Sequence, residues 1–413
     1  MLPCLSPHTA FPRINFKSLM KNKNILPALV PIMFGFFVMG FVDIVGISTS
    51  YVKADFASQL PEHWFGFLPS VVLVWFLVLS IPTSLLMNSI GRKNTVLLSV
   101  AITFAGMAVP FINYNLYTCL VGFAFLGIGN AVLQVSLMPL LTNVVSAQKL
   151  ASAATGGQAV KAVSSFAGPF IAFFAAAELG SWQYIFPIFG GFTAAFGLWL
   201  YAAEIEREKP SQTASLGGTF ALLSDGKILA MFFGIIAVVG VDMGMNMGSP
   251  MLLMERMGLD PSLQSSVAEV ALVPSVYFAC RTVGAFAGTA MLAKMNPRTY
   301  FKIHIIFSLA ATLAMFFVES KIILLALVGC VGYGISSIFS VIFSEALNLK
   351  SDKENEISGL MITAIFGGAV LPPVMTFASK TLSSQNGALS VLAAAMIYLI
   401  ICAFAPETKK AKI

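Results

Sequence analysis

The feature that most limits what this chain can fold into is a series of long, uninterrupted apolar segments. A helix that spans the hydrocarbon core of a bilayer needs about 20 predominantly apolar residues, and about twelve such segments follow one another along the chain. They cover residues 25–52, 64–88, 95–112, 115–140, 151–177, 182–202, 228–254, 266–292, 299–318, 321–347, 357–378 and 387–405. Strands of a membrane barrel would instead alternate apolar and polar residues over about 10 positions. The sequence therefore predicts an all-α membrane protein with twelve transmembrane helices.

The composition excludes a water-soluble protein. Of the 413 residues, 58% are hydrophobic and only 10% are charged, whereas soluble domains carry roughly 25% charged residues. The five cysteines and three histidines are scattered, with no metal-ligand spacing, phosphate-binding loop or nucleophile elbow among them. We therefore expect no enzymatic activity, no cofactor and no metal.

Basic residues are concentrated in alternate connecting segments. One side of the membrane would hold Arg13, Lys17, Lys21, Lys23, Arg92, Lys93, Lys149, Arg207, Lys209, Lys227, Lys294, Arg298, Lys302, Lys350, Lys353, Lys409, Lys410 and Lys412, and the other side only Lys53, Arg256, Lys321 and Lys380. By the positive-inside rule the richly basic side is cytoplasmic, and an even number of helices places both termini there. The net charge of +6 thus reflects topology in a cell (inner) membrane rather than nucleic-acid binding.

One long polar segment divides the chain into two sets of six helices. It covers residues 204–227 and is expected to be a cytoplasmic linker between bundles at residues 25–203 and 228–405, with cytoplasmic segments at 1–24 and 406–413. The two halves echo each other, because MGFVDIVG surrounds Asp43 in the first helix and VVGVDMG surrounds Asp242 in the seventh. The echo predicts two pseudo-symmetric halves.

Four charged residues lie inside the predicted helices, several turns from either end: Asp43, Lys161, Asp242 and Arg281. A charge at the bilayer centre costs about 3 kcal/mol on insertion scales, so such residues face the bundle interior and are candidates for function. Glu269 and Glu345 lie nearer to helix ends, where interfacial water is within reach, and are weaker candidates.

Polar companions lie three or four residues from three of these charges and therefore share a helix face with them. The pairs are Gln158 with Lys161, Asn246 with Asp242 and Tyr277 with Arg281, and Asn130 with Gln134 form a neutral pair on the fourth helix. Amides, carboxylates and an aromatic ring suit a polyhydroxylated solute, whose hydroxyls donate and accept hydrogen bonds. Two structural alternatives stay open: the charges could neutralise each other as ion pairs, and the amides could join helices.

Three positions are expected to distort their helices. They are Pro139 in the fourth helix, Gly168–Pro169 in the fifth and residues 366–373 (FGGAVLPP) in the eleventh. Broken helices in membrane proteins are tolerated where they bend around a cavity.

Several motifs resemble one family. The segment 336–379, SSIFSVIFSEALNLKSDKENEISGLMITAIFGGAVLPPVMTFAS, is similar to the tenth and eleventh helices of the fucose, galactose and glucose symporter branch of the major facilitator superfamily. SIGRKNTVLL resembles the loop motif that follows the second helix of that superfamily. ACRTVGAF, around Arg281, resembles a Gly-Arg-x-x-Gly segment with Cys280 at the first glycine. The resemblance covers nearly all twelve helices and implies a substrate site between two six-helix halves, near the bilayer midplane.

The resemblance also implies roles for single residues. Asp43 matches a first-helix aspartate that the branch uses for proton or substrate coupling, and Asp242 matches an acid often present in the seventh helix. Gln134 stands where the fucose symporters have a protonatable glutamate, and Lys161 stands where they have asparagine. Asn88 replaces the aspartate of the loop motif. The chain thus differs from the fucose symporters at positions implied in sugar and proton handling.

Together these residues predict secondary active uptake of a sugar or sugar derivative by alternating access. Asp43 and Lys161 are predicted to couple protons, and the substrate is predicted to contact Asn130, Gln134, Gln158, Lys161, Asp242, Asn246, Tyr277 and Arg281. The expected partners are a small polar solute such as a monosaccharide, a proton and the lipid bilayer, and the expected state is a monomer. Efflux of amphipathic molecules and uptake of an anionic sugar acid are the alternatives.

Two charge pairings are expected within the bundle. Lys161 lies too deep to reach the interface by extending its side chain, so its partner should be either Asp43 or an anionic group of the substrate. Arg281 and Asp242 should lie close to each other or to the substrate.

Overall fold

The structure is a computed structural model that describes residues 25–56, 58–59, 68–208, 215–259, 270 and 272–405. Every regular element in these residues is a helix. Ten helical segments among them are long and apolar enough to cross a membrane, and the two further predicted spans fall on α5 (Leu68–Ile90) and α13 (Leu272–Leu292). The predicted all-helical class is therefore confirmed. Glu269 lies outside the described residues.

The elements form two consecutive sets. The first comprises α2 (Leu26–Met39), η1 (Gly40–Asp43), α3 (Ile44–Phe56), α5, α6 (Arg92–Ile112), α7 (Leu116–Thr142), α8 (Leu150–Glu178), η2 (Trp182–Tyr184) and α9 (Ile185–Ala202). The second comprises α10 (Leu216–Ala221), η3 (Leu222–Ser224), α11 (Gly226–Arg256), α13, α14 (Pro297–Ala314), η4 (Met315–Phe317), α15 (Lys321–Ile335), α16 (Ile338–Leu349), α17 (Glu354–Thr363), η5 (Ala364–Phe366), α18 (Gly367–Leu382) and α19 (Asn386–Phe404).

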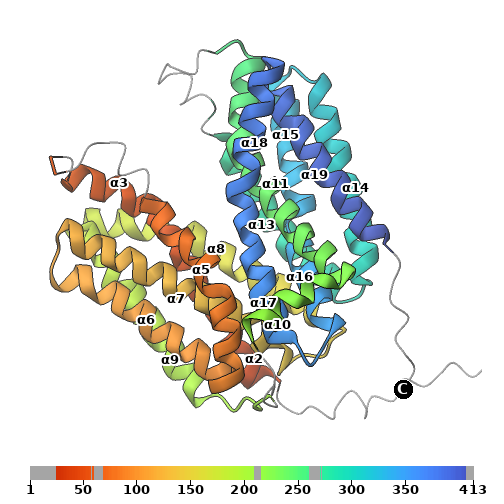
Figure 1. The fold of residues 1–413 in the computed structure, drawn as a ribbon. Coiled ribbons are helices and arrows are strands. Elements are labelled where there is room, and N and C mark those ends of the chain that lie inside the picture. The colour runs from red at the N-terminus through yellow and green to blue at the C-terminus, as the bar shows by residue number, and fades with distance from the viewer. Residues whose placement is uncertain are drawn as a thin grey trace, which may run out of the picture.

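Each set packs into a group of helices, and the two groups meet at one end (Figure 1). Contacts between the groups run from α5, α7 and α8 to α13, α16 and α17. Figure 1 shows the ribbons converging near α10 and α17 and diverging toward the far ends of α3 and α18. We call the converging end the basic end, because the turns with Arg92, Lys93, Lys350 and Lys353 lie there.

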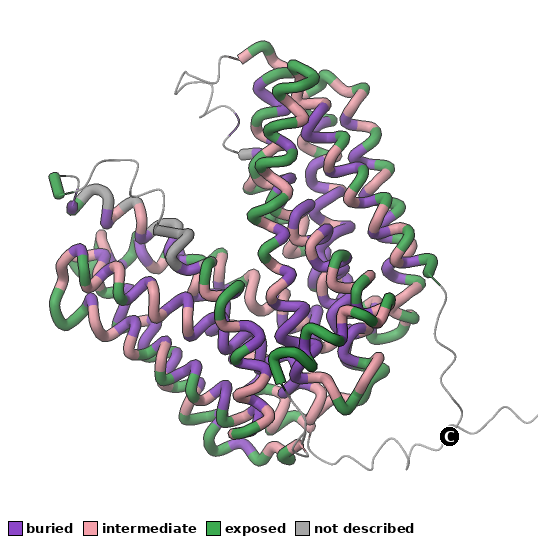
Figure 2. Tube along the Cα trace, in the orientation of Figure 1, coloured by how far each residue is buried: buried purple, intermediate pink, exposed green. Residues whose placement is uncertain are grey.

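Burial follows the pattern of a bundle in lipid. Figure 2 shows buried residues within each group and exposed residues along the outer faces. Those outer faces carry large apolar side chains, such as Phe166, Phe173 and Leu198, which are about 70% exposed. A soluble protein rarely exposes so much contiguous apolar surface, so these faces suit hydrocarbon chains.

Small residues allow the helices of the first group to approach closely. A side chain at Gly122 on α7 would place its Cβ 2.9 Å from the carbonyl oxygen of Gly106 and 3.0 Å from Pro110 on α6. Lipid tails are as apolar as the helix surface, so the hydrophobic effect does not drive membrane helices together. Their association depends instead on close van der Waals packing. The α6–α7 contact therefore depends on having no side chain at Gly122.

Three helix interruptions lie at mid-height in the bundle. The first predicted span breaks at η1, the tenth breaks at Ser336–Ser337 between α15 and α16, and the eleventh breaks at η5. The eleventh was expected to distort at residues 366–373, but its break begins just before them, and Pro372 and Pro373 lie inside α18.

At Pro139 and at Gly168–Pro169, where distortion was expected, α7 and α8 continue without interruption. A proline removes one N–H and so frees the carbonyl four residues earlier. For Pro139 that carbonyl belongs to Val135, and it accepts a hydrogen bond from Ser358 Oγ at 2.6 Å. The freed group is satisfied by the other set of helices, so α7 continues without a break.

We predict that Gly122→Leu lowers the apparent melting temperature in detergent by several degrees, because the new side chain overpacks α6 at a cost of about 1–3 kcal/mol. Gly191→Leu is the matched control, since a Cβ at Gly191 would have no atom within 4 Å. Equal effects of the two substitutions would show that the α6–α7 contact does not need the glycine.

Candidate functional site

A cavity of about 530 Å³ lies between the two groups at mid-height. Its volume is within the roughly 300–1,000 Å³ range of small-molecule sites. Seven of the nine site residues predicted from the sequence line it: Asp43, Gln134, Gln158, Lys161, Asp242, Asn246 and Arg281. All three helix interruptions contribute to the lining, through Asp43, Ser336 and Ile365. The lining therefore combines four charged side chains with amides and an apolar wall.

Asn130 and Tyr277 are the two predicted residues that lie behind the lining. Asn130 Nδ2 donates to the carbonyl oxygen of Met39 at 2.8 Å, next to the η1 interruption. Its Oδ1 accepts from Gln134 Nε2 at 2.8 Å, which orients the amide of Gln134 at the cavity wall. Asn130 thus supports a lining residue and an interruption.

The expected proximity of Arg281 and Asp242 is found. Arg281 Nε on α13 lies 2.8 Å from Asp242 Oδ1 on α11, and the fully buried Tyr277 donates its hydroxyl to the same oxygen at 2.7 Å. The Arg281 and Asp242 side chains are 33% and 14% exposed, so the pair borders the cavity. An ion pair with a supporting hydroxyl is a well-compensated arrangement at this depth.

An ion pair between Asp43 and Lys161 is not formed in this conformation. Asp43 instead accepts a hydrogen bond from Ser165 Oγ at 2.5 Å. Ser165 lies one turn beyond Lys161 on α8, so the carboxylate meets the hydroxyl rather than the ammonium. No carboxylate of the described residues lies within 4.0 Å of Lys161. Both side chains nevertheless line the same cavity.

Besides Ser336, which lines the cavity at the break between α15 and α16, sequence reasoning missed two polar groups near the cavity. Ser165 follows Lys161 by four residues, a spacing that places both on one helix face. The second group is the backbone carbonyl of Asn246, because Pro250 on α11 has no N–H to donate to it. Both groups could have been found from spacings of four residues in the sequence, Lys161 to Ser165 and Asn246 to Pro250.

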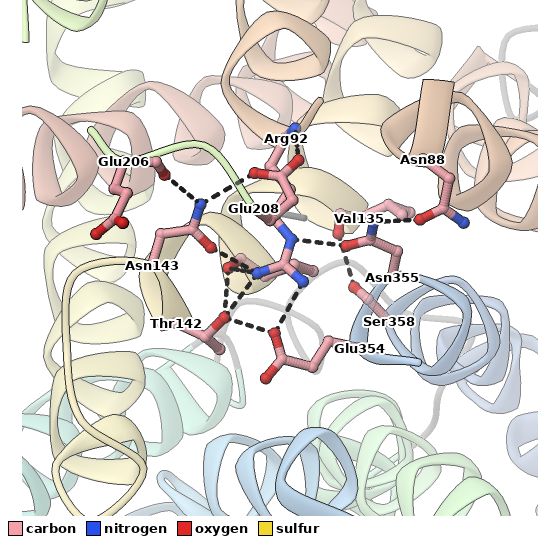
Figure 3. Close-up of polar contacts among 11 residues, drawn as sticks. Asn88, Arg92, Val135, Thr142, Asn143, Glu206, Glu208, Glu354, Asn355 and Ser358 are labelled. Atoms are coloured by element: carbon pink, nitrogen blue, oxygen red, sulfur yellow. Dashed lines mark hydrogen bonds and ion pairs between the residues drawn. The ribbon is translucent and has the colours of Figure 1, made fainter. Parts of the chain in front are cut away.

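Figure 3 shows a buried polar network that joins the two groups at the basic end. Arg92, which is 6% exposed, places Nη2 2.8 Å from Glu354 Oε2 and donates from Nε to Asn355 Oδ1 at 2.7 Å. Its Nη1 donates to the Pro139 carbonyl, Thr142 Oγ1 and Asn143 Oδ1 at 2.9, 2.8 and 2.6 Å, respectively. The guanidinium therefore joins α6 and α7 of the first group to α17 of the second.

Neighbouring residues extend this network. Asn88 Oδ1 accepts from Asn355 Nδ2 at 2.6 Å, so the asparagine of the loop motif bridges the groups without a charge. Glu208, in the segment after α9, accepts from the Arg92 backbone N–H at 2.6 Å and from Asn143 Nδ2 at 3.0 Å. The network joins the two groups at the basic end, and its residues were not among those predicted to be functional.

We predict that Arg281→Gln and Asp242→Asn each lower the apparent melting temperature, because each leaves the other charge unpaired. The double substitution should cost less than the sum of the two losses. The matched control is to neutralise the ion pair between Lys350 and Asp225, which are 3.0 Å apart and 38% and 34% exposed. Its loss should change the melting temperature little, because exposed ion pairs contribute only about 0–1 kcal/mol. Additive losses at Arg281 and Asp242 would contradict the pairing.

Comparison with solved structures shows the same fold elsewhere. The chain superposes on the E. coli fucose:proton symporter FucP with a TM-score of 0.80, 16% identity, and coverage of 94% of this chain and 100% of that one. It superposes on the proton:xylose symporter XylE with a TM-score of 0.70, 12% identity, and coverage of 93% and 96%.

Two curated relatives of Helicobacter pylori are each described as a putative glucose/galactose transporter. The relative of strain 26695 is 25% identical over 380 residues, or 85% of this chain and 88% of the relative. The relative of strain J99 is 27% identical over 183 residues, or 44% of this chain and 42% of the relative.

A family model also matches. The model described as Major Facilitator Superfamily covers residues 29–373, which includes the cavity and the network at the basic end. The resemblance seen in the sequence motifs is thereby confirmed. The chain belongs to the Major Facilitator Superfamily, and it is a multi-pass membrane transporter rather than an enzyme.

Proposed function

We propose that this protein takes up a monosaccharide or a monosaccharide derivative by alternating access, coupled to protons. The observation that carries the proposal is the polar, charged cavity between two groups of helices whose described residues meet at one end. The names of similar proteins support the substrate class, since they include glucose/galactose transporters and symporters of fucose and xylose with protons.

The proposed topology places the basic end in the cytoplasm and both termini on that side of the cell (inner) membrane. Its excess of Lys and Arg supports this orientation. The network around Arg92 then closes the cytoplasmic exit, and the cavity faces outward. A neighbouring FucP structure with a TM-score of 0.80 is likewise described as being in the outward conformation.

Transport then requires the two groups to rock about the cavity. We propose residues 25–203 and 228–405 as the moving halves and residues 204–227 as the linker between them. The cavity is built from a single chain, so a monomer has all the parts it needs.

Asp43 is the proposed proton carrier. It is exposed to the cavity, and its carboxylate is fixed by Ser165. A carboxylate takes up a proton more readily when it moves from a wet to a dry environment, and alternating access supplies that change. Gln134, Gln158 and Asn246 are the proposed amides for the sugar hydroxyls.

We predict that Asp43→Asn abolishes uphill, proton-driven uptake in proteoliposomes while sugar exchange between the two sides continues. Asparagine keeps the shape of the side chain and a group for Ser165 but carries no proton. Exchange without net accumulation would assign Asp43 to coupling. Near-normal accumulation by the variant would remove Asp43 from the mechanism.

We predict that Arg92→Gln shifts the protein toward a conformation open at the basic end, because it removes the ion pair with Glu354. Spin labels at Asn94 and Ser351, both exposed near that end, should show a longer distance component. Lys93→Gln is the control, since Lys93 lies next to Arg92 in the sequence while its Nζ donates to carbonyls of its own group, those of Tyr201 and Ala203. Identical distance distributions in wild type and Arg92→Gln would contradict a locking role.

A further inference from the structure

We propose that the substrate is a sugar acid, a monosaccharide that carries one carboxylate, and that Lys161 binds this carboxylate. The inference rests on the proposed function and narrows it to one chemical class. Its basis is the charge balance of the cavity between the two groups of helices.

Lys161 lies deep in the bundle. It is eleven positions after Leu150, where α8 begins at the basic end, or about 16 Å along the helix axis at 1.5 Å per residue. A lysine side chain cannot carry its ammonium over that distance to the interface. The charge must therefore be compensated inside the cavity, by water, by protein groups or by a bound anion.

The other three charges of the cavity already have protein partners. Arg281 and Asp242 form an ion pair at 2.8 Å, and Asp43 accepts the hydroxyl of Ser165. Among the residues that the structure describes, no acid lies within 4.0 Å of Lys161. The ammonium is the cavity charge that this conformation leaves ready for a ligand.

The neighbours of Lys161 suit a sugar acid as well. Gln158 lies one turn away on the same helix face and also lines the cavity, where its amide can bind hydroxyls next to the carboxylate. On the facing helix α7, Gln134 supplies another amide. A glutamate at that position would repel an anionic substrate, whereas a glutamine does not.

Charge balance favours one carboxylate over a neutral sugar or a phosphate ester. Among the residues that the structure describes, the ionisable groups that line the cavity with Asp43 are Lys161, Arg281 and Asp242. Without a proton on Asp43 the four charges sum to zero. Once Asp43 is protonated, the lining carries one positive charge. A single carboxylate neutralises this charge, whereas a doubly charged phosphate would leave the cavity with one negative charge. A neutral sugar would leave that charge uncompensated in the closed state, at a cost.

The same balance predicts that one proton accompanies one sugar acid, so that the loaded carrier moves no net charge. Uptake should then follow a pH gradient and respond little to membrane potential. Symport of a neutral sugar with a proton would move one positive charge and depend on both.

The test uses the full chain in proteoliposomes with two matched substrate pairs, D-galactose with D-galacturonate and D-glucose with D-glucuronate. Wild type is expected to bind at least one acid at least tenfold more tightly than its neutral partner. Lys161→Gln should lose at least tenfold in affinity for that acid and change affinity for the neutral sugar less than twofold. Lys161→Arg should retain the acid preference. Lys149→Gln, exposed one residue before α8 begins, is the control for removing a charge and should behave as wild type.

The outcomes separate this inference from the proposed function. Transport of a neutral sugar with rejection of both acids overturns the inference and leaves the proposed function standing. Transport of neither class overturns both. A Lys161→Gln variant that keeps the acid preference overturns the role of Lys161. If that variant fails to fold, uptake of the acid by the wild type is measured under an inside-negative membrane potential set with potassium and valinomycin. An uptake rate that doubles or more under this potential overturns the charge balance.

Discussion

A charge inside a membrane is stable only when a neighbouring group or water compensates it, and this constraint organises the centre of the protein. The four deep charges come from four different helical segments, yet they line one cavity. Arg281 and Asp242 tie α13 to α11, and Ser165 on α8 holds Asp43 at the η1 interruption. The helices that carry charges must therefore lie next to one another around the cavity, because each charge needs a compensating group nearby.

A second constraint is that each freed backbone carbonyl needs a donor. Proline inside a helix removes one donor, and the protein uses the freed carbonyls rather than breaking the helix. The Val135 carbonyl, freed by Pro139, accepts a hydrogen bond from Ser358 of the other group. The Asn246 carbonyl, freed by Pro250, lies on the helix turn that faces the cavity. Pro139 therefore places an acceptor where the two groups meet.

The sequence was sufficient for the fold and for the charged and amide residues of the cavity lining, for physical reasons. Apolar length marks a membrane span, and an isolated charge within a span must face inward. Asp43, Lys161, Asp242 and Arg281 could therefore be placed together from the sequence alone. Contacts between distant side chains could not be predicted in this way. The sequence alone could not distinguish Ser165 from Lys161 as the partner of Asp43, because both lie on the same face of α8. Their roles in transport stay predictions.

The network at the basic end escaped the sequence analysis because a charged residue at a helix end looks like an ordinary interfacial residue. Its relation to the cavity is visible only in the fold. The continuous helix α7 carries Gln134 at the cavity wall, Val135 bonded to Ser358, and Thr142 bonded to Glu354 at 2.7 Å. One continuous helix therefore contributes both to the cavity wall and to the contacts that join the two groups at the basic end.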